Sequence, residues 1–371
     1  MAMTEQAKLK VKVGDLLPGT HYRPTPGYKG YFPEIGWDTY ADLFDSIRTN
    51  DARGYLEMWR LWEGMAKKRF GHIPTGDELP DHGKAWTWEK QEHRLRTMLA
   101  SFEKHGYQPS LATGGEAEIK VAIQANGTMP VFQGNKRVAL LRIFHGPEFE
   151  LTVTVKERAE EWQRMRRAIY NIAGGKMDCY QPIEHPDFEG WTVTQPCDER
   201  MAMMRAELEY HWPNTVLDLG SHTGWFCRAF ADTGGLMATG VEESPQAHRM
   251  SYIMAERQGL QGRIELQNST ILDYMSDPGR DLCEYDVCLF LSIVMHVFRD
   301  CGVNGGWDHL AYISRHCERM FLDLSWGAYA KHLPFTPDNI GPMICEKTEF
   351  TSWQLLGRTN KENRPFYVFR R

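Results

Sequence analysis

The chain has 371 residues, of which 42% are hydrophobic and 25% are charged, a composition typical of soluble globular proteins. This length exceeds one ordinary domain, so we expect two domains, and the composition excludes a mainly disordered, collagen-like or coiled-coil protein. The first 175 residues carry 25 Lys and Arg against 22 Asp and Glu, a balance of +3, whereas residues 176–371 carry 18 against 27, a balance of −9. Neither half is basic enough to bind nucleic acid through charge alone.

Apolar runs and cysteines set further expectations about the class of protein. No stretch of about 18 apolar residues occurs, so we expect no membrane span. The N-terminus lacks the apolar segment of a signal peptide, so a cytoplasmic protein is expected. All eight cysteines lie from Cys179 onward and none forms a CxxC pair. We therefore expect reduced thiols in the core, with neither a metal cluster nor a disulfide framework.

Helices and strands alternate in the first 175 residues. The expected helices are 40–46, 54–69, 89–104, 138–144 and 157–172, and the expected strands are 119–123, 129–132 and 150–155. After Gly174-Gly175 the cysteine usage and the sign of the charge both change, which marks a domain boundary.

The turn before the helix at 138–144 reads Gln133-Gly134-Asn135-Lys136-Arg137. A helix N-terminus offers unpaired N–H groups and a positive dipole end, and two cationic side chains add charge, so a phosphate group suits this turn. With the upstream helix and Gly106-Tyr107-x-Pro109, the strand–turn–helix resembles the ParB/sulfiredoxin-like domain over residues 91–156.

The ParB/sulfiredoxin-like resemblance implies a ligand for this turn. In that superfamily an Asp-Gly-Asn-x-Arg turn binds nucleotide phosphates or DNA-partition ligands, and here Gln133 stands where the family has Asp. A phosphate-bearing ligand, such as a nucleotide, is therefore expected on Gly134, Asn135, Lys136 and Arg137. The alternative is a degenerate domain that serves substrate docking or homodimer formation.

From residue 213 onward, short apolar strands alternate with helices. The expected strands are 215–219, 237–242, 263–267, 287–291, 320–324 and 366–369, and the expected helices are 225–233 and 245–258. Strands of this kind predict an α/β fold with a doubly wound, mostly parallel sheet that helices cover on both faces.

The first of these strands runs into a glycine loop, and residues 216–226 read VLDLGSHTGWF. Gly220 and Gly224 would let the backbone approach a ligand and let the helix pack closely on the strand. Glu242 ends the next strand, 24 residues after Asp218, where a carboxylate can accept hydrogen bonds from both ribose hydroxyls. The dinucleotide pattern G-x-G-x-x-G is absent, so a nucleoside ligand without a pyrophosphate fits better.

The order of strand, glycine loop, helix and second-strand acid resembles class I S-adenosylmethionine-dependent methyltransferases, with a Rossmann-like fold. Across residues 179–371 the chain is similar to one group, the methyltransferase domain of the bifunctional kinase–methyltransferases that cap the polymannose O-antigen chain. The segments that carry this likeness are Tyr180-Gln181-Pro182-Ile183, Cys197-Asp198-Glu199-Arg200, Leu291-Ser292-Ile293-Val294-Met295-His296, Met320-Phe321-Leu322-Asp323-Leu324 and Arg364-Pro365-Phe366-Tyr367. Met295 replaces the first histidine of the family's His-His pair, and the kinase domain has no counterpart.

The resemblance implies roles for individual residues. Donor-binding roles fall on Tyr180, Arg200, Asp218, Gly220, Ser221, Gly224, Glu242, Ser269, Thr270 and Ser292. Arg200 would pair with the donor carboxylate, Glu242 would hold the ribose, and Ser269 and Thr270 would lie near the adenine. His296 would be the catalytic residue. The alternatives are a loop tyrosine at 180, a surface salt bridge at Arg200 and a core histidine at 296.

The last strand opens with Arg364, which would face the methyl acceptor or only fix that strand in place. Taken together, the patterns predict a ParB/sulfiredoxin-like α+β domain with an N-terminal extension at 1–156, a linker helix at 157–178 and a methyltransferase domain at 179–371. The expected function is S-adenosylmethionine-dependent O-methylation of a sugar hydroxyl or phosphate of a glycan or small-molecule precursor, with no metal.

Two other functions remain open. The first is a nucleic-acid methyltransferase in which the ParB-like domain holds DNA or RNA. The −9 balance of the second half and the lack of an Asn-Pro-Pro-aromatic or Asp-Pro-Pro-aromatic motif argue against it. The second is a non-enzymatic nucleotide-sensing switch with a vestigial methyltransferase, which the intact Asp218, Gly220, Gly224 and Glu242 argue against.

Overall fold

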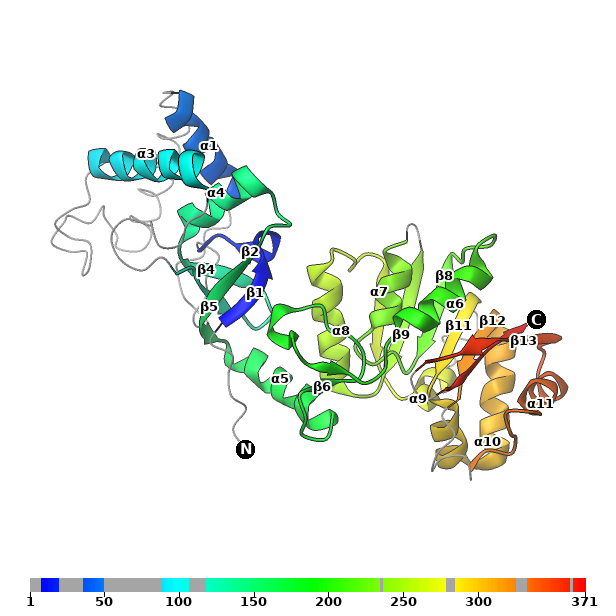
Figure 1. The fold of residues 1–371 in the computed structure, drawn as a ribbon. Helices are drawn as coiled ribbons and strands as arrows, with labels where there is room; N and C mark the ends of the chain where they lie inside the picture. The colour runs from blue at the N-terminus through cyan, green and yellow to red at the C-terminus, as the bar shows by residue number, and fades with distance from the viewer. Residues whose placement is uncertain are drawn as a thin grey trace. The chain divides into compact units, whose positions relative to one another are not determined.

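A computed structural model describes residues 8–19, 36–49, 88–106, 118–233, 236–277, 284–324, 332–360 and 363–371 (Figure 1). The described residues fall into two compact units. The first unit runs up to Arg164 and also includes His185–Glu189, and the second unit comprises Met165–Glu184 and Gly190–Arg371. The helix expected at 54–69, Tyr107, Pro109 and Cys283 lie outside the described residues.

Within the described ranges, the first unit contains a five-stranded mixed sheet, three complete α-helices and the start of α5 (Glu160–Ile172). Its strands lie in the order β1 (Lys8–Lys12), β5 (Glu150–Arg158), β3 (Lys120–Ile123), β4 (Met129–Gln133) and β2 (Leu16–Leu17). Strand β5 is antiparallel to β1 and parallel to β3, and β4 is antiparallel to β3 and parallel to β2. The helices are α1 (Trp37–Thr49), α3 (Trp88–His105) and α4 (Asn135–His145), and α1 packs on both α3 and α4. The α+β composition agrees with the prediction for this part of the chain.

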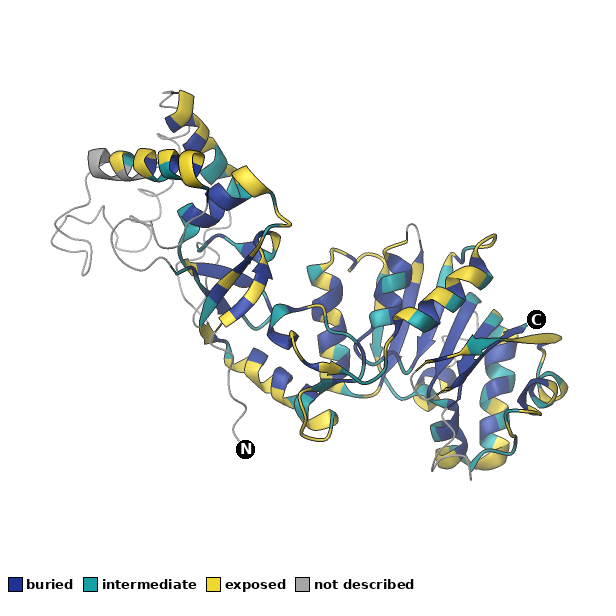
Figure 2. Cartoon of the chain, viewed as in Figure 1, coloured by how far each residue is buried: buried dark blue, intermediate teal, exposed yellow. Residues whose placement is uncertain are grey.

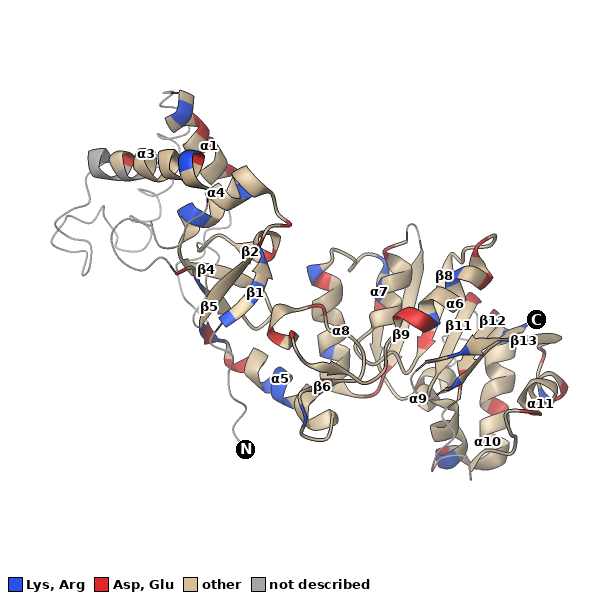
Figure 3. Ribbon diagram, viewed as in Figure 1, with Lys and Arg blue, Asp and Glu red and all other residues tan. Residues whose placement is uncertain are grey.

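Strand β1 was not expected from the sequence. Leu9 and Val11 are buried while the three lysines between and beside them are exposed, which is the two-residue period of a strand with one buried face. Each lysine pairs with a glutamate, at 3.9 Å for Lys8–Glu118, 2.5 Å for Lys10–Glu150 and 2.6 Å for Lys12–Glu148. Glutamates from other segments therefore neutralise the exposed lysines of this strand. Figure 3 shows both signs of charge on each unit.

A buried ion pair holds the segment His185–Glu189 in the first unit. Two nitrogens of Arg158 donate to the Asp187 carboxylate at 2.7–3.1 Å, and the indole N–H of Trp162 donates to the same carboxylate at 2.9 Å. The His185 ring bonds the carbonyl of Gly127 at 2.9 Å and packs on Trp162. This segment contains the short helix η5 (Pro186–Phe188).

The second unit is built on a seven-stranded sheet. The strand order is β10 (Ile264–Asn268), β9 (Met237–Glu242), β8 (Thr215–Leu219), β11 (Tyr285–Leu291), β12 (Cys317–Asp323), β14 (Pro365–Arg370) and β13 (Ser352–Arg358). The first five strands are parallel, and β14 is antiparallel to both its neighbours. The chain winds outward from β8 through β9 to β10 and then returns to β11, so the topological switch point lies between β8 and β11.

Helices accompany every parallel strand of this sheet. They are α6 (Asp198–Leu208), α7 (Trp225–Ala231), α8 (Pro245–Arg257), α9 (Ile271–Ser276), α10 (Val294–His316) and α11 (Ile340–Lys347), preceded by the end of α5 (Glu160–Ile172) and the small β6–β7 pair (Asp178–Cys179 and Thr192–Val193). Helices α6, α9, α10 and α11 and strands β6, β7 and β13 were not predicted. None of the helices in the described ranges is both long and apolar enough to cross a membrane.

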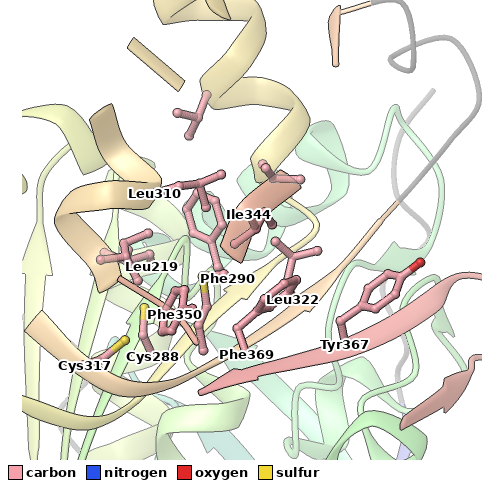
Figure 4. Packing of buried hydrophobic residues seen from close by; sticks show 14 of the residues in the cluster. Leu219, Cys288, Phe290, Leu310, Cys317, Leu322, Ile344, Phe350, Tyr367 and Phe369 are labelled. Carbon is pink, nitrogen blue, oxygen red and sulfur yellow. The ribbon is translucent and has the colours of Figure 1, made fainter. Parts of the chain in front are cut away.

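Alternate residues of the central strands enter two separate cores, one on each face of the sheet. Cys288, Phe290 and Leu322 pack with α10 and α11 in one core (Figure 4), whereas Val287, Leu289 and Phe321 pack with α6 and α7 in the other. Figure 2 shows the buried colour running through the middle of the sheet. The prediction of a doubly wound, mostly parallel sheet covered on both faces is confirmed.

The described cysteines are free thiols, and five of them are buried. Across the described part of the chain, no group of three or more His, Cys, Asp or Glu side chains is placed to hold a metal ion.

The division between the two units falls inside α5, between Arg164 and Met165. The sequence interpretation treated 157–178 as a linker helix. In the structure α5 begins at Glu160, and its last turns belong to the second unit.

Candidate functional site

The glycine loop follows β8 and is held by backbone hydrogen bonds. The N–H groups of Gly220 and Ser221 both donate to the carbonyl of Val241, at 2.9 Å each. Gly220 has φ 77°, and a Cβ there would lie 2.8 Å from Ile293. Gly224 has φ 69° at the start of α7, and a Cβ there would collide with Ser251 of α8. Both glycines are therefore required by a left-handed backbone and by close packing.

Glu242 ends β9 beside this loop, and its carboxylate is oriented by two backbone donors. The N–H of His222 donates to Oε2 at 2.9 Å and the N–H of Ser244 donates to Oε1 at 2.8 Å. Burial raises the pKa of Glu242, and the two backbone hydrogen bonds lower it in part. The side chain is 9% exposed, so its accessible atoms face a restricted space.

A cavity of about 730 Å³ opens at the carboxyl ends of β8, β9 and β11. Nine residues singled out from the sequence line it: Tyr180, Arg200, Asp218, Gly220, Glu242, Ser269, Thr270, Ser292 and His296. Ser221, Gly224 and Arg364 are not among the described residues that line it. The cavity volume is that of a typical small-molecule site, which spans roughly 300–1,000 Å³.

Asp323 organises a buried ionic cluster at one side of the cavity. Its carboxylate accepts hydrogen bonds from the Ser292 N–H and hydroxyl and from Nη1 of Arg200, at 3.2 Å for the arginine. Nη1 of Arg364 donates to the Ser292 hydroxyl at 2.8 Å and lies 4.0 Å from Asp323. Arg200 is thus in a buried ion pair, and the alternative of a surface salt bridge is wrong.

Asp323 belongs to the strand motif at 320–324 and was not predicted as a site residue. Its signal was a carboxylate directly after the apolar residues Phe321 and Leu322, at the carboxyl end of a central strand. Ser292 adopts φ 59°, a strained conformation for a non-glycine residue that the bonds to Asp323 maintain. Both arginines lie within 4.0 Å of the Asp323 carboxylate, so charged groups of both signs stand beside the cavity.

Asp218 lies at the cavity wall, and no cationic side chain among the described residues hydrogen-bonds it. Burial raises the pKa of Asp218 to about 7, with a further increase from Glu242 and decreases from the Cys227 thiol and Arg200. The Cys227 Sγ lies 3.7 Å from Oδ2 of Asp218. Two acids therefore border the same cavity, and both have raised pKa values.

The segment that carries Tyr180 is clamped to the glycine loop. Oε1 of Gln181 accepts from the Thr223 hydroxyl at 3.1 Å and from the Trp225 N–H at 3.3 Å. The Tyr180 ring packs on the His222 ring with centroids 5.0 Å apart. Gln181 was not predicted as a site residue, and in the structure it anchors this segment to the glycine loop.

His222 is a cavity residue that the sequence interpretation missed. Burial lowers the pKa of His222 to about 4, so its imidazole is neutral at physiological pH. Its position inside the glycine loop was the available signal, since the loop itself was recognised.

His296 lies in the first turn of α10 and is half-buried at the cavity. Burial lowers its pKa first, and Arg299 lowers it further, whereas Asp300 and Glu243 act in the opposite direction. Arg299 itself bonds Asp300 at 2.6 and 2.7 Å. A histidine with a lowered pKa is neutral at pH 7 and is able to accept a proton.

The opposite wall is formed by the start of α9 and the end of α5. Thr270 caps α9: its hydroxyl accepts from the Asp273 N–H at 3.0 Å and donates to that carboxylate at 2.7 Å. The Ser269 hydroxyl donates to the carbonyl of Thr270 at 3.0 Å. Apolar surface comes from Ile271 and Leu272, and from Ile169, Ile172 and Ala173 of α5.

In the first unit, the Gly134–Arg137 turn begins α4. Gly134 has φ 106°. Oδ1 of Asn135 accepts from the Gly19 N–H at 2.6 Å, and Nη2 of Arg137 donates to the carbonyl of Glu118 at 3.2 Å. Two of the side chains expected to bind phosphate thus also bond the protein's own backbone, and Arg137 is buried.

Comparison with known proteins gives partial similarities. Neither a protein-family model nor a curated protein matches the sequence. Among solved structures, the bifunctional kinase-methyltransferase WbdD is similar over 54% of this chain, with 19% identity and a TM-score of 0.44. The match covers 46% of the WbdD chain, so the present chain spans about half the length of WbdD. The methyltransferase domain of bacterial CtHen1-CN is similar over 47% of this chain and 98% of its own, with 15% identity and a TM-score of 0.37. EvdMO1 is similar over 49% of this chain and 43% of its own, with 16% identity and a TM-score of 0.35.

Proposed function

We propose that the second unit binds S-adenosylmethionine in this cavity and transfers its methyl group to an oxygen. The observation that carries the proposal is the Glu242 carboxylate at the end of β9. Each of its oxygens accepts one backbone hydrogen bond and keeps a second acceptor site, so two adjacent ribose hydroxyls are each able to donate to one oxygen.

The rest of the cavity fits the other parts of this molecule. The guanidinium of Arg200 borders the cavity and suits the carboxylate of the methionine portion. The apolar side chains of Ile271 and Leu272 suit the faces of the adenine ring. These residues border one cavity, so a single extended ligand is able to contact both sets.

The chemistry divides between donor and protein. When bound, S-adenosylmethionine supplies a methyl group on a positively charged sulfur, which an acceptor oxygen attacks in line. The protein then contributes proximity and orientation. A neutral His296 is suited to take the proton of a sugar hydroxyl, whereas a phosphate monoester is already ionised near neutral pH and needs no base.

The lowered pKa of His296 favours the hydroxyl acceptor. By resemblance, the acceptor is a sugar hydroxyl or phosphate of a glycan or small-molecule precursor. The test is to incubate the full chain with methyl-labelled donor and fractionated cell extract, and to identify the products by mass spectrometry. Label in a sugar-containing fraction is expected. Label in DNA or RNA would replace this acceptor by nucleic acid, and no labelled product from donor-bound protein would contradict the proposed transfer.

We also propose that the first unit binds a phosphate-bearing ligand at the start of α4. The test uses Lys136, because Arg137 is buried and its Nη2 donates to the Glu118 carbonyl. In the full chain, Lys136→Ala is expected to weaken binding of CTP, ATP or nucleotide sugars, measured by calorimetry. Lys10→Ala, on the exposed face of β1, is the control. If none of these compounds binds the wild type, a docking or dimerisation role replaces this proposal.

A further inference from the structure

His222 combines two features that are costly unless they serve a ligand. It has φ 52°, and within the described ranges only Ser292 and Asn363 are other non-glycine residues with positive φ. Strained residues of this kind cluster at functional sites. His222 and Ser292 border the same cavity.

The second feature is the state of the imidazole nitrogens. Both Nδ1 and Nε2 are buried, and neither has a hydrogen-bond partner within the part of the chain that the structure describes. Buried polar groups in folded proteins are nearly always paired, so two unpaired nitrogens on one side chain require an explanation. The residue as a whole is only half-buried and borders the cavity, so rotation about its Cβ–Cγ bond is a route for a nitrogen to reach the cavity surface.

The neighbours of His222 place it between the two ends of the site. Its backbone N–H is bonded to Glu242, the carboxylate proposed to hold the ribose. Its ring packs on Tyr180, which is near enough to Arg200 and Asp323 to interact electrostatically with both. The backbone of His222 therefore contacts the residue at the ribose end, and its ring contacts a residue near the end proposed to hold the carboxylate.

We infer that His222 is a donor-recognition residue whose neutral imidazole accepts a hydrogen bond from the ammonium group of the ligand's amino-acid portion. This inference rests on the proposed function. An unprotonated ring nitrogen is an acceptor, and an ammonium group is a strong donor. A protonated ring would instead repel both the ammonium group and the sulfonium sulfur, and the buried setting keeps the ring neutral.

The test compares three ligands that share the nucleoside but differ in the tail. Wild type and His222→Phe are titrated by calorimetry with S-adenosylmethionine, S-adenosylhomocysteine and methylthioadenosine, which lacks the amino-acid portion. The variant keeps a ring against Tyr180. It is expected to bind the first two ligands about 10-fold to 100-fold more weakly and methylthioadenosine nearly as well as wild type.

Two controls separate recognition from a structural effect. The melting temperature of the free variant is expected to stay close to that of wild type, because the removal of two buried unpaired nitrogens offsets the strain of a phenylalanine at φ 52°. His248→Phe is the matched control: Nε2 of His248 is also buried without a partner, but the residue does not line the cavity, so ligand affinity is expected to stay at the wild-type value. If His222→Phe does not fold, His222→Gly, which adopts positive φ without strain and has no side-chain acceptor, is expected to show the same selective loss.

Each outcome decides between specific statements. Equal loss for all three ligands would assign His222 to the nucleoside and overturn the contact with the amino-acid portion. Unchanged affinity for all three in a folded variant would overturn any recognition role. If the wild type binds none of the three, the proposed function itself fails, and that result differs from a failure confined to His222.

Discussion

Replacing Glu242 by Gln is the most informative substitution in the glycine-loop region. The two carboxylate oxygens each face a backbone N–H, from His222 at 2.9 Å and from Ser244 at 2.8 Å. In Gln one oxygen becomes an NH₂ group, so one of these backbone donors meets another donor. The charge that would attract the ribose hydroxyls is also lost.

Both losses can be given a magnitude. A hydrogen bond to a charged group contributes about 1.5–3 kcal/mol, so affinity for S-adenosylhomocysteine is expected to fall roughly 10-fold to 150-fold. The unpaired backbone donor is expected to cost about 1–3 kcal/mol of unfolding free energy. Calorimetry measures the first effect, and denaturant unfolding of the free protein measures the second.

Glu243→Gln is the matched control, because this neighbouring acid also lines the cavity but is exposed. Its affinity for the ligand is expected to remain close to that of wild type. A Glu242→Gln protein that binds S-adenosylhomocysteine as tightly as wild type would refute the assignment of Glu242 to the ribose.

Three further predictions concern other buried groups. With a hydroxyl acceptor, His296→Ala is expected to lose about 10²-fold to 10⁴-fold in methyl-transfer rate. The wild-type rate should rise with pH through a pKa below the ordinary 6.5, and the variant's pH profile should lack this rise. A fully active variant would make His296 a structural residue. Burial raises the pKa of Asp218 from 3.8 to about 7, so the protonated carboxyl stabilises the fold at low pH and this contribution is lost as pH rises to about 7. The melting temperature of Asp218→Asn should therefore increase relative to that of wild type between pH 4 and 8. Parallel curves of melting temperature against pH for the two proteins would contradict this. Asp187→Ala removes the carboxylate that pairs with the buried Arg158 guanidinium, and it is expected to lower the free energy of unfolding in denaturant by about 3–5 kcal/mol. Glu150→Gln, in an exposed pair with Lys10, should leave the unfolding midpoint nearly unchanged. Equal effects of the two substitutions would show that the buried pair has no special role.

Local patterns in the sequence were sufficient to predict the central strands of the second unit's sheet. The strand at Thr215–Leu219 was predicted at its observed bounds, because a buried parallel strand is a short apolar run that ends in a turn signal. Strand β13 was missed because it is an edge strand whose side chains are mostly exposed, so it lacks an apolar run. Strand β1 was missed because its lysines dominate the composition, although every second residue is buried.

The site was predictable where neighbours in sequence are neighbours in space. The glycine loop and Glu242 belong to consecutive strands, so their proximity follows from the fold. The contact between Arg200 and Asp323 joins residues 123 positions apart, and nothing in the local sequence specifies it. The unpaired ring nitrogens of His222 likewise depend on how Tyr180 packs, which only the three-dimensional structure shows.

A crystal structure of the full chain with S-adenosylhomocysteine tests the central claim most directly. The account predicts the ligand in the cavity at the carboxyl ends of β8, β9 and β11, with both ribose hydroxyls about 2.5–3.0 Å from the Glu242 carboxylate. The ligand carboxylate is predicted to contact Arg200. A ligand bound elsewhere, or one in the cavity whose ribose does not contact Glu242, would contradict it.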